Sequence, residues 1–110
     1  MKFLCLAYGD EAGWNGLSEQ EKKDALAQDK VIQDRGNFVS AVQPTVTAVR
    51  NWDNNLQVTA GIDETHGLPL AGFSVIEAAN VEEVIALVAN TPCARASGVI
   101  EIRQLWNTNS

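Results

Sequence analysis

The sequence has no cluster of basic residues. Its 8 Lys and Arg residues are scattered along the chain and are outnumbered by 14 Asp and Glu residues, so the net charge is −6. Proteins that bind nucleic acid neutralise phosphates with grouped Lys and Arg side chains, and anionic membrane surfaces attract the same groups. The composition therefore predicts no nucleic-acid partner and no membrane partner.

Cysteine and long apolar runs are also scarce. The two cysteines, Cys5 and Cys93, form no CxxC spacing, and we expect both to be reduced. The opening apolar run ends at Tyr8, before Gly9, which is too short for a signal sequence or for a membrane span. These features predict a cytoplasmic protein.

Several motifs that carry chemistry are missing as well. The sequence contains no Gly-rich phosphate loop, no Ser–His–Asp order and no reactive Cys–His pairing. His66 is the single histidine, and one imidazole with neighbouring carboxylates does not supply the three or four convergent ligands that zinc needs. We predict no cofactor and no metal site.

What is present is the pattern of one α+β domain over residues 1–110, a usual size for a single core. Apolar runs and helical periodicity predict alternating strands and helices. The expected strands are residues 3–8, 38–42, 45–49, 56–59, 71–77 and 99–105, and the expected helices are residues 18–35 and 80–90.

Turn and capping residues mark where these elements begin and end. Ser18 and Glu21 fit a capping box, as do Asn80 and Glu83, and Gly36 fits a left-handed helix end. The first helix has a thin apolar stripe, which we expect to lie on a sheet; its members are Ala25, Leu26, Val31 and Ile32. Residues 9–16 and 60–69 are expected to be loops, and residues 45–59 a hairpin.

This order of elements predicts a ferredoxin-like split β-α-β protomer with an inserted β-hairpin. In such a fold the helices cover one face of the sheet. Residues 3–8 are apolar on both alternating faces, so the other face also needs a cover, and no third helix is expected. A second copy of the same sheet is the simplest cover, and we predict a homodimer.

The residues of several segments resemble those of the YCII-related, DGPF-domain family. The matching segments are residues 8–11 with Trp14 and residues 17–18, residues 58–59, residues 70–73, residues 76–77, residues 91–94 and residues 100–103. The resemblance implies a dimeric α/β barrel with a small-molecule cleft. Some relatives are thought to use a His–Asp acid–base pair, and others are encoded beside sigma factors.

The chain departs from this family at its signature loop. The family's Asp-Gly-Pro-Phe aligns with residues 60–63, where only Gly61 matches and Ala60 replaces the carboxylate. The resemblance therefore leaves Asp63 as the candidate for a displaced carboxylate. In an extended chain Asp63 and Ala60 face opposite ways, so a turn at Gly61 would be required to re-aim it.

Three residues are candidate catalytic groups: Asp10, Asp63 and His66. A general base needs an imidazole or carboxylate oriented beside its proton. The simpler interpretation of His66, which we favour, is a solvated loop histidine; that of Asp10 is turn and helix-start chemistry. We expect the first and third core strands to run parallel, which would place Asp10 and His66 at opposite ends of the sheet within one chain.

Three further residues are candidate ligand contacts: Tyr8, Glu11 and Trp14. They lie around the acidic turn that follows the first strand, a position where rigid strands often support functional loops. Core or interface packing is the alternative for the two aromatic residues. Two hypotheses of function remain open: a small-molecule-binding or regulatory protein, and an acid–base enzyme acting on a small organic substrate in the dimer cleft.

Overall fold

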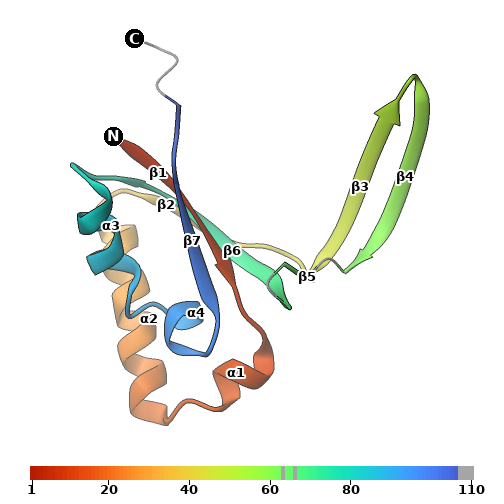
Figure 1. The fold of residues 1–110 in the computed structure, drawn as a ribbon. Coiled ribbons are helices and arrows are strands. Elements are labelled where there is room, and N and C mark those ends of the chain that lie inside the picture. Colours follow the sequence, from red (N-terminus) through yellow and green to blue (C-terminus); the bar gives the residue numbers. More distant parts are fainter. Residues whose placement is uncertain (63, 66, 107–110) are drawn as a thin grey trace.

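The computed structural model describes residues 1–62, 64–65 and 67–106. Figure 1 shows helices gathered on one side of a sheet, with a long hairpin projecting from the other end of the domain. In chain order the elements are β1 (Lys2–Tyr8), α1 (Glu11–Asn15), α2 (Glu19–Asp34), β2 (Phe38–Ala41), β3 (Thr45–Trp52), β4 (Asn55–Ile62), β5 (Glu64–Thr65), β6 (Leu68–Glu77), α3 (Val81–Val88), α4 (Pro92–Arg95) and β7 (Val99–Gln104).

The main sheet has the strand order β2-β6-β1-β7, and every neighbouring pair is antiparallel. Helix α2 connects β1 to β2, and α3 with α4 connects β6 to β7. Two such β-α-β units interleaved in one antiparallel sheet define the ferredoxin-like α+β fold. The predicted fold class is therefore confirmed.

The pairing of β1 with β6 corrects one sequence-based expectation. These first and third core strands run antiparallel, with Lys2 opposite Glu77 and Tyr8 opposite Leu70. The end of β1 and the start of β6 therefore lie at the same end of the sheet. The expectation of parallel strands was wrong because the parallel partners in a split β-α-β unit are β1 and β2, which are separated by β6.

The core lies between the sheet and the helices. Phe3 on β1 and Ile76 on β6 are opposite each other, and both are almost fully buried, as are Ile32 of α2 and Val84 of α3. Burying each of these side chains contributes roughly 1.5–3 kcal/mol. The four central side chains come from four different elements, so this cluster joins both helices to the sheet.

Helix α2 begins and ends as predicted, but its apolar stripe is narrower than expected. Ser18 and Glu21 form the full capping box, and Gly36 adopts a φ of 87° after the helix. Leu26 and Val31 are 55% and 46% exposed. The expectation that they pack on the sheet was wrong, since only the narrow face around Ala25 and Ile32 is buried.

Helix α3 is capped by Asn80, whose side chain accepts from the Glu83 amide. Glu83 reaches back to the amide of Ala79, at 3.1 Å, instead of the amide of Asn80. It also accepts from Arg35, at 3.1 Å. The capping residues were predicted correctly, but the Glu83 carboxylate accepts from the amide of the residue before the cap and not from the amide of the cap itself.

Strands β3 and β4 form the predicted hairpin, and both strands are longer than expected. Asp53 and Asn54 have φ of 55° and 59°, the left-handed pair that a two-residue hairpin turn requires. The hairpin extends away from the helices (Figure 1). Its apolar side chains are largely exposed, with Trp52 at 73% and Val49 at 64%.

The segment of residues 60–69 was expected to be a loop, and most of its described part is strand. Strand β4 continues to Ile62, and β5 pairs with the start of β6, with Glu64 opposite Pro69. Gly61 lies within β4, opposite Val46, so the chain makes no turn there. The expectation was wrong because polar residues are tolerated in strands whose faces are not buried.

Candidate functional site

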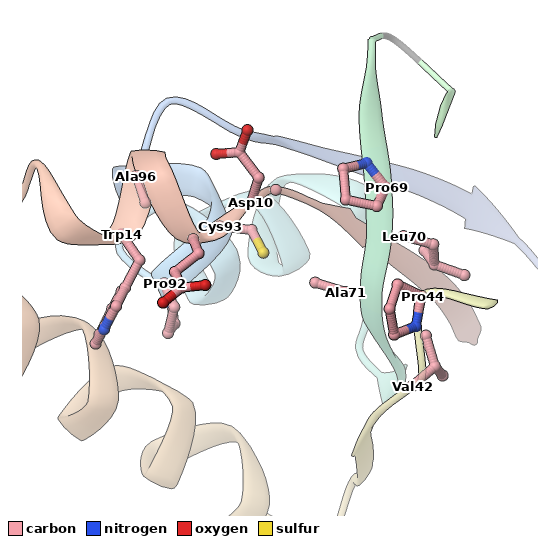
Figure 2. Close-up of a pocket in the computed structure, with 12 residues that line it drawn as sticks. Asp10, Trp14, Val42, Pro44, Pro69, Leu70, Ala71, Pro92, Cys93 and Ala96 are labelled. Atoms are coloured by element: carbon pink, nitrogen blue, oxygen red, sulfur yellow. The ribbon is translucent and has the colours of Figure 1, made fainter. Parts of the chain in front are cut away.

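An apolar hollow of about 450 Å³ lies at the end of the sheet where β1 ends and β6 begins. Figure 2 shows Asp10, Trp14 and Pro92 on one side of this space and Val42, Pro44 and Leu70 on the other. We call it the outer hollow. It is lined by Gly9, Asp10, Glu11, Trp14, Val42, Pro44, Pro69, Leu70, Ala71, Pro92, Cys93 and Ala96.

One wall of the outer hollow is the short helix α1, which was expected to be part of a loop. The carboxylate of Asp10 caps this helix by accepting a hydrogen bond from the Gly13 amide, at 2.9 Å. Gly13 packs so closely on α4 that a Cβ there would lie 2.0 Å from the Ala96 carbonyl oxygen. Helix α1 has only 5 residues, which is too short to show a helical repeat of apolar residues, so the sequence pattern did not reveal it.

Helix α1 carries two of the candidate ligand contacts, Glu11 and Trp14, and both line the outer hollow. Glu11 lies in the first turn and is exposed, and Trp14 is half-buried. The Lys22 ammonium lies 5.8 Å from the centre of the Trp14 ring, a cation–π distance. This contact holds the indole against α2 at the edge of the hollow.

The opposite wall depends on an irregularity in β6. The pairing with β1 shifts between Ala7, opposite Gly72, and Tyr8, opposite Leu70. Ala71 is thereby left as the extra residue of a β-bulge, and its carbonyl accepts from the Val42 amide at 2.9 Å. Bulges re-aim strands and are common beside functional sites. Here the bulge bends β6 so that Pro69, Leu70 and Ala71 line the hollow.

A second space of about 210 Å³ adjoins the first and lies under α2; we call it the inner hollow. Both hollows are lined by Ala71, Pro92 and Cys93. The inner hollow exists because the helix-covered face of the sheet carries small residues at this end, Ala7, Ala41 and Gly72. Side chains this small leave a gap between the sheet and α2.

Asp29 of α2 lines the inner hollow and was missed in the sequence analysis. It lies on the same helix face as the buried residues Ala25 and Ile32, because it is four residues after Ala25 and three before Ile32, and residues three and four apart share a helix face. Burial raises the pKa of the Asp29 carboxyl above its ordinary value of 3.8. The signal available in the sequence was an acidic residue within the apolar stripe of the helix.

Cys93 stands where the two hollows meet. Its sulfur lies 3.0 Å from where a Gly9 Cβ would be, so glycine is required for the turn after β1 to approach the thiol. Burial, and secondly the charge of Asp29, raise the pKa of the Cys93 thiol. A thiol with a raised pKa stays protonated and is a poor nucleophile, so Cys93 acts here as a weakly polar wall.

The family is identified by a domain model that matches almost the whole chain. The model of the YCII-related domain matches residues 1–109. The chain belongs to this family. The resemblance stated from the sequence is thereby confirmed.

Among solved structures, the chain is similar to the 5-chloro-2-hydroxyhydroquinone dehydrochlorinase of Burkholderia phenoliruptrix AC1100, in a complex with 2,5-dihydroxybenzoquinone. The two share 17% sequence identity over 100% of each chain, with a TM-score of 0.45. No match was found among curated proteins.

Tyr8, Asp63 and His66 are the remaining candidate site residues. Tyr8 is buried beside the bulge and is not among the residues that line the outer hollow. Asp63 and His66 lie outside the described residues. The signature position Ala60 is exposed on the projecting hairpin, opposite Thr47, and lines neither hollow.

The antiparallel pairing of β1 and β6 removes the reason for separating Asp10 from the segment that contains His66. The Gly9 amide donates to the Pro69 carbonyl at 3.0 Å, so the acidic turn adjoins the start of β6. Strand β5 pairs with that same start. The backbone on both sides of position 66 therefore lies at the same end of the sheet as Asp10.

In the described part of the chain, no group of three or more His, Cys, Asp and Glu side chains is arranged to hold a metal ion. None of the helices in it has the length and apolar character needed to cross a membrane.

Proposed function

We propose that this YCII-family protein binds a small organic molecule in the adjoining outer and inner hollows. The observation that carries the proposal is that Asp10, Glu11 and Trp14, from one short stretch of the chain, all line the outer hollow. Asp10 and Trp14 lie across this space from Pro44 and Leu70 (Figure 2). Ligand sites are typically concave, largely apolar spaces of about 300–1,000 Å³ with a few polar groups. The outer hollow alone, at about 450 Å³, falls within this range.

The walls favour a ligand with a flat apolar body. Three prolines, Pro44, Pro69 and Pro92, and the Trp14 indole provide rigid surfaces, which lose little side-chain entropy on binding. The carboxylate of Asp10 is engaged in capping α1, so its first role is to fix this wall. The cap uses Oδ1 alone, so the second carboxylate oxygen can still accept a proton or a hydrogen bond from a ligand.

The binding proposal is tested by an NMR screen of small aromatic compounds against the protein labelled with ¹⁵N. Binders are expected to shift the amides of Trp14, Ala71 and Cys93. Trp14→Ala is expected to weaken binding, whereas Trp52→Ala, on the exposed hairpin, should leave binding unchanged. Shifts confined to the hairpin, or equal losses in both variants, would contradict the site.

We also propose that the protein is a homodimer joined through the helix-free face of the sheet. Alternation along the strands places apolar side chains on this face, including Phe38 and Phe73, whose tilted rings have centroids 5.5 Å apart. Phe38 is 61% exposed in the single chain. Light scattering should give twice the chain mass of 11.9 kDa.

Two matched variants sharpen the dimer test. Phe38→Glu is expected to produce a monomer because it places a charge on the proposed interface. Val49→Glu introduces the same charge on the hairpin at similar exposure, and it is expected to leave the dimer intact. A wild-type monomer at micromolar concentration would refute the interface. The cytoplasmic location stays a prediction.

A second candidate function is an acid–base enzyme that acts on a small organic substrate in the same cleft. The observation that favours it is the hydrogen bond between Gly9 and Pro69, which brings the acidic turn beside the start of β6. His66 and Asp63 would then be the proton-transfer groups. An NMR titration tests this: a shifted His66 pKa that returns to normal in Asp63→Asn supports it, and an ordinary pKa opposes it.

A further inference from the structure

Among the described residues that line the two hollows, every charged side chain is acidic: Asp10, Glu11 and Asp29. The Lys22 ammonium, 5.8 Å from the centre of the Trp14 ring at the edge of the outer hollow, lines neither space. The whole chain has a net charge of −6. A cleft lined by one sign of charge raises the local concentration of ligands of the opposite sign. An anionic ligand would meet repulsion here, and a cationic ligand would be attracted.

Asp29 differs from other aspartates of this region in having no donor. Asp24, on the same helix, accepts from the Gln20 amide at 2.9 Å, and Asp34 accepts from Lys30 at 3.3 Å. Asp10 accepts from the backbone of Gly13. Within the described residues, Asp29 makes no hydrogen bond and no ion pair.

The partial burial of Asp29 has a cost for the free protein. Asp29 is half-buried on the face of α2 that packs on the sheet, so its carboxylate keeps some contact with solvent but loses part of its hydration, and no donor among the described residues compensates for that loss. Among the described residues, the other titratable side chain that lines the inner hollow is the Cys93 thiol, which is neutral when protonated and so does not offset the charge of Asp29. A donor from outside the chain would remove the cost.

We infer that the ligand is a small primary amine with a flat apolar body, and that Asp29 anchors its ammonium group in the inner hollow. The inference rests on the proposed binding function and names its ligand class. The apolar body would then lie in the outer hollow between Trp14 and Pro69, which adjoins the inner hollow at the shared lining residues Ala71, Pro92 and Cys93. Glu11 at the exposed rim would attract the cation to the entrance.

The chemistry of the pair supports this arrangement. Charge-assisted hydrogen bonds between an ammonium and a carboxylate are about twice as strong as neutral ones. Burial raises the pKa of Asp29, and a bound ammonium would lower that pKa, because an opposite charge at close range favours the ionised carboxylate. Binding of the amine would therefore reverse an unfavourable feature of the free protein.

The test uses three probes of nearly equal shape: benzylamine, benzyl alcohol and benzoate. Each is titrated at pH 7 into the wild-type protein, Asp29→Asn and the matched control Asp24→Asn, and binding is followed by the amide shifts of Cys93 and Ala71. Benzylamine is expected to bind wild type and the Asp24→Asn variant about tenfold more tightly than benzyl alcohol. Benzoate is expected to bind most weakly.

In the Asp29→Asn variant the preference for the amine should fall to about twofold or less, since the remaining attraction comes from exposed charges screened by salt. Equal binding of the amine and the alcohol to wild type, or an amine preference that survives Asp29→Asn, would overturn the inference and leave the proposed function standing. Failure of all three probes to shift these amides would overturn both.

Discussion

The helix-covered face of the main sheet is built differently at its two ends. At one end, Phe3 and Ile76 project from the sheet and meet Val84 and Ile32 of the helices. At the other end, the same strands carry Ala7 and Gly72, and α2 presents Asp29 instead of an apolar side chain. The strands are continuous through both ends, so the difference comes entirely from side-chain size and polarity.

This comparison shows how one small sheet supplies both stability and a site. A close-packed end fixes the relative positions of β1, β6, α2 and α3, and the small residues at the other end leave room under the same helix. Natural proteins often accept local destabilisation where a ligand binds. In this chain the unfavourable elements, an unpaired half-buried carboxylate and unfilled space, are found together at the hollow end.

The largest expected difference between the ends is the cost of deleting a large side chain. Ile76→Ala should destabilise the protein by about 2–5 kcal/mol because it leaves a cavity in a closed core. Ile100→Ala, which enlarges the existing inner hollow, should cost clearly less. Urea denaturation measures both. Equal losses would show that the hollow end is packed as tightly as the core.

Introducing a larger side chain at each end should also lower stability, but by less than the deletions do. Ala78 is buried in the core cluster, so Ala78→Leu is expected to cost about 1–3 kcal/mol through overpacking. Ala7 borders the inner hollow, and Ala7→Leu should cost less than that while weakening binding of the aromatic probes. Similar destabilisation by both variants would argue against free space beside Ala7.

The wall of the outer hollow should depend on the oxygen of Asp10 and not on its charge. Asp10→Ala removes the cap of α1 and is expected to lower stability by about 1 kcal/mol. Asp10→Asn keeps a side-chain oxygen acceptor and should be nearly neutral. Thermal denaturation of the two variants gives the comparison. A loss in Asp10→Asn as large as that in Asp10→Ala would indicate a role for the charge.

The smallest effect concerns Asp29 and pH. Its pKa is raised on folding, so the folded state binds the proton more tightly than the unfolded state. Stability is therefore lost as pH rises from the ordinary pKa of 3.8 through the folded pKa. Asp29→Asn should have a higher Tm than wild type at pH 7, and the difference should vanish below about pH 3.8, the ordinary pKa.

Asp24→Asn provides the control for this pH dependence. Asp24 lies on the same helix and is exposed, with Gln20 as its donor. Its substitution should leave the Tm nearly unchanged across the same pH range. A stabilisation of equal size in Asp24→Asn would show that the gain comes from reducing the negative charge of α2 in general, and not from the burial of Asp29.

Much of the fold could be predicted because it is written in local patterns. The capping residues Ser18 and Asn80, the left-handed Gly36 and the turn at Asp53 each act through contacts with near neighbours in the chain. The order of strands and helices then restricts the topology to the split β-α-β arrangement. The acidic turn and Trp14 were also found from sequence, because they follow the first buried strand.

The sequence by itself therefore determined the longer helices and strands, their order, the family and one side of the site, but not the short elements α1 and β5. Only the tertiary structure decided that β1 and β6 run antiparallel, that Ala71 forms a bulge, and that Asp29 and Cys93 line the same hollow. These features depend on residues more than forty positions apart along the chain meeting across a sheet. Local sequence preferences do not determine such long-range contacts, since the direction of strand pairing and the unfilled space are set by the packing of whole elements.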